Sequence, residues 1–268
     1  MTVLARPWAR TLGLVAVVFA LITLFVMFGG GAAHAATIPE IPTPDTDVKV
    51  DINGIDGTPS SSILTLLGIT LLSVAPALLL MMSSFTKIFV VLAMTRNALG
   101  LQTIPPNQVI AGLALFLSMF IMWPVLTDIN TVAVQPYVEG TVTFTDAVGL
   151  GWEPLQKWML GFTREEDLAL MTRFAGFENP ASPADVPFQT LIPAFMISEL
   201  RAAFIIGFVI FVPFLIIDLV VSAALMSMGM MMLPPVMISL PFKILLFILV
   251  DGWALILTTL LQSYGGGG

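Results

Sequence analysis

The sequence contains no cysteine, a single histidine (His34) and few charged side chains. Without cysteine there can be no disulfide, no thiolate metal site and no cysteine nucleophile. Charged residues make up 10% of the chain and hydrophobic residues 57%, against about 25% and about 45–50% in soluble domains. A water-soluble globule of this composition would expose too much apolar surface. The composition therefore predicts an all-α integral membrane protein.

The first 35 residues have the pattern of a cleavable signal peptide. Two arginines within the first ten residues precede an apolar stretch at 11–28, and a small-x-small cleavage pattern follows. The residues at the expected cleavage site are Ala33, Ala35 and Ala36. Cleavage there removes His34, so the mature chain would have no imidazole for acid–base catalysis or metal binding. An uncleaved N-terminal anchor helix is the alternative, because the apolar stretch is long.

Two polar segments interrupt the chain. Residues 36–62 are rich in Pro, Asp, Gly, Thr and Ser, and we expect a flexible segment in the periplasm. Residues 127–190 are acidic, and we expect them on the periplasmic side as well. Within them, Glu165 to Phe174 is predicted to form a short amphipathic helix. Neither segment carries the basic patch that nucleic-acid binding requires, so no nucleic-acid partner is expected.

Four apolar segments of the mature chain are long enough to cross a membrane, which takes about 20 helical residues. They lie at 63–82, 109–126, 191–221 and 236–262. We expect them to form two long helical hairpins, 63–126 and 191–264, followed by a glycine tail at 265–268. The connection that carries Lys87 and Arg96 is expected to face the cytoplasm, because signal cleavage leaves the N-terminus outside and basic loops stay inside.

Five charged residues interrupt the apolar stretches of the second half. They are Glu199, Arg201, Asp218, Lys243 and Asp251. Such charges normally face protein or a water-filled cavity and are often paired. Glu199 and Arg201 are two residues apart and lie on different helix faces, so their partners must come from other helices. We predict a pair between Glu199 and Lys243; for Asp218, a side chain that reaches the membrane interface is the alternative.

A methionine cluster lies between the last two apolar segments, at 226–237, beside Gly229 and a pair of prolines at 234–235. Helical hydrogen bonding is hard to maintain there, and irregular backbone at membrane depth must be shielded by protein or line a water-filled cavity. Because methionine is flexible and polarizable, the cluster suits a deformable seal around a passing chain. Ordinary apolar packing is the alternative.

Sequence motifs for catalysis are missing. There is no phosphate-binding loop, no cluster of metal ligands and no nucleophile triad. We therefore expect a protein that is not an enzyme and has no cofactor, so energy for any transport must come from elsewhere.

Several long blocks resemble the FliP family of flagellar biosynthesis proteins. They are PALLLMMSSFTK at 76–87, PPNQV at 105–109, IPAF and SEL within 192–200, FVPFLIIDLV at 211–220, MGMMMLPP at 228–235, LPFK at 240–243 and VDGW at 250–253. The resemblance covers about residues 61–264, with the acidic segment at 128–185 matching only loosely. Blocks of this length are very specific.

The resemblance implies a subunit of the export gate of the flagellar type III secretion apparatus. Several copies would form a pore in the basal body with the companion subunits FliQ and FliR, in the bacterial inner membrane. The pore would pass unfolded flagellar subunits, with other export components supplying energy. By the same resemblance, Met230, Met231 and Met232 would form the pore constriction, and Glu199 and Lys243 would pair between neighbouring subunits.

Two other functions stay open on the sequence. The first is the equivalent subunit of a virulence type III secretion system, although members of that branch usually lack a signal peptide. The second belongs to a different class: an ion-coupled small-molecule transporter with proline-broken helices around a midplane site, in which Glu199 or Asp218 carries the proton.

Overall fold

The computed structural model describes residues 61–101, 103–230 and 234–265. The expected signal peptide, its cleavage residues Ala33, Ala35 and Ala36, and most of the expected flexible segment lie outside the described residues, as do Met231 and Met232. The chain divides into two compact units, Met1–Pro76 and Ala77–Gly268. In the first unit the structure describes only residues 61–76, the larger part of helix α2. The site discussed below belongs entirely to the second.

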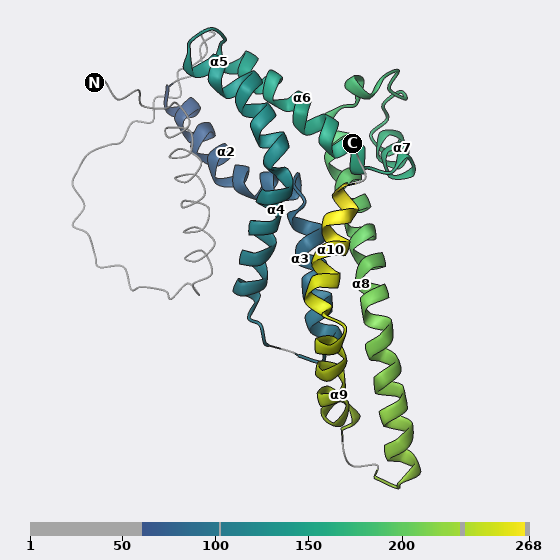
Figure 1. Ribbon diagram of the computed structural model, residues 1–268. Helices are drawn as coiled ribbons and strands as arrows, with labels where there is room; N and C mark the ends of the chain where they lie inside the picture. The colour runs from purple at the N-terminus through teal and green to yellow at the C-terminus, as the bar shows by residue number, and fades with distance from the viewer. Residues whose placement is uncertain (1–60, 102, 231–233, 266–268) are drawn as a thin grey trace, which may run out of the picture. The chain divides into compact units, whose positions relative to one another are not determined.

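The described residues are helical and contain no strand (Figure 1). The α-helices are α2 (Ser61–Met81), α3 (Phe85–Ala98), α4 (Asn107–Ile129), α5 (Gln135–Val138), α6 (Phe144–Phe162), α7 (Glu165–Phe174), α8 (Phe188–Ser227), α9 (Pro235–Leu249) and α10 (Gly252–Gly265). A π-helical turn, Asn130–Val134, joins α4 to α5, and a 3-10 turn, Pro183–Asp185, precedes α8. The expectation of an all-α protein is confirmed.

Two helical stretches are long and apolar enough to cross a membrane, Asn107–Val138 and Phe188–Ser227. Each of two helix pairs also qualifies if it is counted as one broken span: Gly68–Met81 with Phe85–Ala98, and Pro235–Leu249 with Gly252–Gly265. The described part of the chain thus offers two membrane-spanning candidates, or up to four. The sequence predicted four spans, but the one at 63–82 matches α2 alone, whereas the first broken pair also includes α3.

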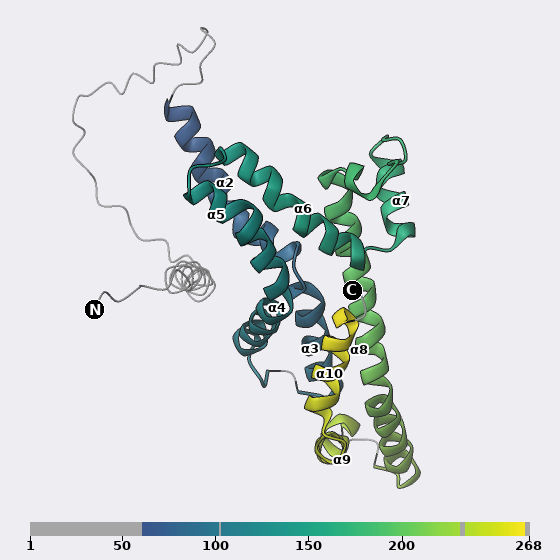
Figure 2. The ribbon, with the colours of Figure 1, turned by 45° about the horizontal axis from the view of Figure 1, so that its top comes forward.

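Helix α3 lies at the centre of the second unit, packed against α4 on one side and α8 on the other (Figures 1 and 2). Its residues Ile88, Val91 and Leu92 are almost completely buried. Helices α3 and α8 can approach closely because α8 has a glycine at the contact. A Cβ atom on Gly207 would lie 2.4 Å from the Sδ atom of Met94 in α3.

The last apolar segment is not the single helix that was expected at 236–262. It bends by 62° between α9 and α10. Asp251 has a φ of +49°, in the left-handed region that L-residues rarely adopt, and so ends α9. At Gly252 an added Cβ would lie 2.3 Å from the ring of Phe247, so only glycine fits this close turn. The bend has a local cause in these three residues.

The two polar connections also differ from a simple loop. The stretch that carries Lys87 and Arg96 is helix α3, and Lys87 is buried rather than exposed. The acidic segment contains α7, with the predicted bounds, and also α6, which was not predicted. Helix α6 begins at a capping box in which Thr143 and Asp146 satisfy one another's backbone N–H groups.

Candidate functional site

Three helices meet at a buried ion pair. Lys87, in the first turn of α3, donates a hydrogen bond of 3.0 Å from Nζ to Oε1 of Glu199 in α8. Both side chains are nearly inaccessible, at 3% and 2% exposed. The hydroxyl of Tyr264, in the last turn of α10, donates to the other carboxylate oxygen of Glu199. We call these three residues the Lys87 cluster.

Aromatic rings enclose the charge of Lys87. Its Nζ atom lies 3.7 Å from the centroid of the Tyr264 ring and 5.7 Å from that of Phe162. Trp158 stacks on Tyr264 with the ring centroids 6.1 Å apart, and it contacts Phe195 of α8 at 5.3 Å. A desolvated ammonium over aromatic faces gains cation–π attraction. The cluster therefore joins α3, α6, α8 and α10 through one buried charge.

Hydroxyl groups next to the Lys87 cluster bring in α4. Ser84, immediately before α3, donates a 2.9 Å hydrogen bond to Ser118 in α4, and the Tyr264 hydroxyl lies 3.4 Å from the Ser84 carbonyl oxygen. Both serine side chains are buried. Small hydroxyl residues allow helices in an apolar setting to approach closely and to bond across the interface. Their positions next to Lys87 fix where α3 begins relative to α4.

Helix α7, within the acidic segment, is tied to α8 beside Glu199. Ser198 donates a 2.7 Å hydrogen bond to Asp167 in α7 and accepts one of 3.0 Å from the backbone N–H of Arg164. Arg164 also forms a 2.5 Å ion pair with Glu166. Arg201 lies 4.0 Å from the same carboxylate but is 54% exposed. An exposed pair of this kind contributes little.

A second ion pair, partly buried, lies further along α8. Lys243, in α9, donates from Nζ to Oδ2 of Asp218 in α8 at 2.6 Å and to the carbonyl oxygen of Ala98 at the end of α3 at 3.3 Å. Ser239 donates to the other carboxylate oxygen of Asp218 at 2.5 Å. Gly100, with a φ of +79°, turns the chain past the ammonium group. This Lys243 cluster joins α8, α9 and the end of α3.

The charged residues singled out in the sequence form other pairs than the one predicted. Glu199 and Lys243 do not contact one another within the chain, because each has a different partner, Lys87 and Asp218 respectively. Asp218 is paired, which argues against the alternative that it only reaches the interface. A Glu199–Lys243 pair between neighbouring subunits stays a prediction. Asp251 marks the bend between α9 and α10 and forms no ion pair with the described residues.

Sequence reasoning missed Lys87 and Tyr264 as members of a site. Lys87 was assigned to a cytoplasmic connection because signal cleavage leaves the N-terminus outside and basic loops stay inside. A signal was nevertheless present, since uncharged sequence leads up to Lys87 and the next apolar residues follow directly. Tyr264 is one of two tyrosines and ends the last apolar helix. A buried tyrosine hydroxyl needs a hydrogen-bond partner, but the sequence does not say which.

Exposed methionines mark the turn after α8. Met226 and Met228 are more than half exposed, and Met230 is 40% exposed. Gly229 has a φ of +74° and ends the helix, and Pro235 begins α9. The described methionine side chains of this turn are thus partly or largely exposed. Among the described residues no group of His, Asp or Glu has a geometry that could hold a metal ion.

Comparison with known proteins decides the family. The model of the FliP family matches residues 68–260, which include both buried clusters except Tyr264. The chain belongs to the FliP family. The resemblance found from the sequence blocks is thereby confirmed, and the protein is a component of the flagellar biosynthesis and export machinery.

Individual relatives agree with the family model. The chain is 54% identical to the flagellar biosynthetic protein FliP of Bacillus subtilis, over 76% of this chain and 93% of the relative. It is 53% identical to that of Pectobacterium carotovorum, over 76% and 79% of the two chains. It is 41% identical to that of Caulobacter vibrioides, over 88% and 90%. All three relatives of this FliP-family chain carry a flagellar name.

Proposed function

We propose that this FliP-family chain is a subunit of the export gate through which unfolded flagellar proteins leave the cytoplasm. Several copies would surround a pore in the bacterial inner membrane, at the flagellar basal body, together with the companion subunits FliQ and FliR and other export components. The chain itself would be a structural, non-enzymatic part of the channel.

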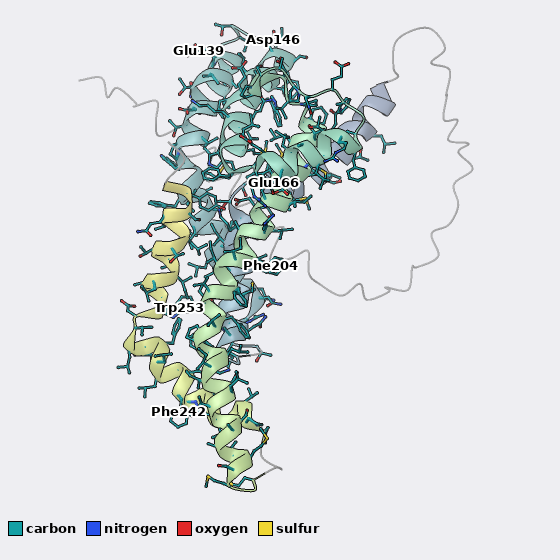
Figure 3. All side chains as sticks on the ribbon, turned by 90° about the vertical axis from the view of Figure 1, so that its right-hand side faces the viewer. Glu139, Asp146, Glu166, Phe204, Phe242 and Trp253 are labelled. Carbon is teal, nitrogen blue, oxygen red and sulfur yellow. The ribbon has the colours of Figure 1, made fainter. Side chains whose placement is uncertain are left out.

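The length and surface of α8 carry this proposal. With 40 residues and a rise of 1.5 Å per residue, α8 is about 60 Å long, whereas a bilayer core is about 30 Å thick. Large apolar side chains remain exposed along it, among them Phe204, which is labelled in Figure 3. Phe208, Leu219 and Val220 are exposed as well. Lipid can cover only about half of such a helix. The rest requires other protein subunits, as an oligomeric gate would supply.

The methionine turn supports a pore. It lies at one end of the long α8, its described methionines are exposed, and a flexible thioether surface can adapt to chains of varied sequence. We propose that Met230, with Met231 and Met232, closes the pore around the passing chain. A small-molecule transporter would instead need a polar substrate site, whereas the charges of the two clusters here are already paired with one another.

The test is a deletion of the gene in its own host, complemented by the full chain with an affinity tag. Complementation should restore motility and the release of hook and filament proteins into the medium. The tagged chain, purified from membranes, should elute as an oligomer with its companion subunits. A deletion strain that keeps motility but no longer releases virulence effectors would show that the chain belongs to a virulence type III secretion system. A functional monomer would contradict the gate.

A further inference from the structure

An apolar groove opens between the α3–α4 turn and the bend of α9 and α10. Its volume is about 590 Å³, within the range of roughly 300–1,000 Å³ usual for small-ligand pockets. Leu92, Val109, Ile244, Phe247 and Trp253 are among the residues that line it. The lining is almost entirely apolar, and Val109 and Trp253 remain exposed, so the groove is accessible from the surface.

One charged residue, Arg96, lines this groove. Its Nη1 atom donates to the Pro105 carbonyl oxygen at 3.0 Å and to Oδ1 of Asn107 at 2.7 Å, which fixes the orientation of the guanidinium group. The Nε atom is buried and has no hydrogen-bond partner among the described residues. Nor does any described carboxylate form an ion pair with Arg96. A positive charge and a buried donor are thus left unsatisfied beside an apolar groove.

We propose that this groove binds one anionic phospholipid, with an acyl chain along the apolar wall and the phosphate group on Arg96. Guanidinium and phosphate form strong charge-assisted hydrogen bonds, and basic pockets between membrane helices bind anionic headgroups. Trp253 is 44% exposed at the groove, where an amphipathic indole suits the lipid–water interface. A neutral apolar helix in the groove would leave the Nε donor and the charge of Arg96 unpaired, which is costly.

The proposal does not depend on the export function, and it can be tested on the full chain purified in detergent. Brominated acyl chains quench tryptophan fluorescence on contact, so Trp253 serves as a reporter. Brominated phosphatidylglycerol and brominated phosphatidylcholine of the same chain length are titrated into the wild-type protein and into Trp253→Phe. The difference between these two proteins isolates quenching at the groove.

We expect saturable quenching of Trp253 by phosphatidylglycerol, and about fivefold weaker apparent affinity for phosphatidylcholine, as expected for the loss of one surface charge interaction. Arg96→Gln should abolish this preference, whereas Arg96→Lys should keep most of it. The matched control is Arg201→Gln, which removes an exposed arginine outside the groove and should change nothing.

Equal affinity for the two lipids in the wild-type protein would overturn the headgroup assignment. Quenching that disappears when the chain forms an oligomer would show that a second copy covers the groove, and this also contradicts the proposal. If Arg96→Gln fails to fold, Arg96→Lys decides. Retained preference for phosphatidylglycerol in Arg96→Lys supports a charge interaction with the headgroup. Loss of that preference contradicts such an interaction. If brominated lipids do not quench Trp253, but inorganic phosphate changes the Trp253 fluorescence of the wild-type protein and not that of Arg96→Gln, the site binds an anion and no lipid.

Discussion

Lys87 and Glu199 lie 3.0 Å apart, separated by 112 positions in the sequence, and almost no water reaches either side chain. A buried ion pair adds little stability relative to well-packed apolar residues, because both charges lose their hydration. Breaking one side of the pair is different, since an uncompensated charge then remains in the interior. The Lys87 cluster is therefore where single substitutions should have large effects and double substitutions smaller ones.

Lys87→Met is expected to destabilise the chain by roughly 3–5 kcal/mol, because it leaves the Glu199 carboxylate with only the Tyr264 hydroxyl. Lys87→Met combined with Glu199→Gln should lose less than the sum of the two single variants. Thermal unfolding of the purified full chain in detergent measures both. Arg201→Met, at an exposed arginine, is the control and should be nearly neutral. Additive losses would show that Lys87 and Glu199 act independently.

Tyr264 contributes through two separate parts of its side chain. Tyr264→Phe removes the hydroxyl that donates to Glu199 but keeps the ring beneath Lys87, and should cost about 1.5–3 kcal/mol, the range for a hydrogen bond to a charged group. Tyr264→Ala also removes the ring and should cost more. The comparison is made by thermal unfolding of the two variants. Equal losses would mean that the ring contributes nothing to holding α10.

Much of this fold follows from hydrophobic length and local signals. The segments predicted at 109–126 and 191–221 are the centres of α4 and α8, and α7 has the predicted bounds Glu165–Phe174. Long apolar stretches allow only helices in a membrane, and the acidic first turn of α7 suits a helix N-terminus. These features act over a few residues, so one sequence suffices to detect them.

The pairing of Glu199 with Lys87 and the bend between α9 and α10 could not be predicted from local sequence. Glu199 pairs with Lys87 because α3 lies beside α8, and no short-range pattern indicates which helices are neighbours. The bend falls within a long apolar stretch in which Asp251 was recognised only as a charge, and glycine is common in membrane helices, so Gly252 did not indicate a bend. The positive-inside rule assigned Lys87 to a connection between spans, whereas Lys87 lies in α3, just after the break of a candidate bent span, and its side chain is buried.

The Lys243 cluster tests whether the second ion pair belongs to the single chain or to the assembly. Asp218→Asn should leave Lys243 buried with its charge only partly satisfied, and we expect a loss of roughly 3–5 kcal/mol in the purified chain. Lys243→Ala should destabilise the chain in the same way. If either substitution leaves thermal unfolding unchanged but prevents oligomer formation, the essential partner of that residue is on a neighbouring subunit.

The bend between α9 and α10 should be sensitive to a single methyl group. Gly252→Ala places a Cβ 2.3 Å from the ring of Phe247, so either the ring or the bend must move, at a cost of about 1–3 kcal/mol. Phe247→Leu in the same chain should restore part of the loss. Gly161→Ala is the matched control, because a Cβ there meets nothing within 4 Å. Thermal unfolding that is equal for Gly252→Ala and Gly161→Ala would contradict the packing argument.

The methionine turn should affect the tightness of the gate and leave its assembly intact. Replacing Met230, Met231 and Met232 by Gly removes flexible apolar side chains, of which Met230 is 40% exposed and lies outside the buried core. The purified complex should therefore form normally. Membranes that contain it should leak small ions, measured as conductance or as slowed growth on expression. The control is Met159→Leu, a volume-conserving change at a buried methionine, which should not alter permeability. Unchanged permeability in a fully assembled triple variant would mean that these methionines do not seal the pore.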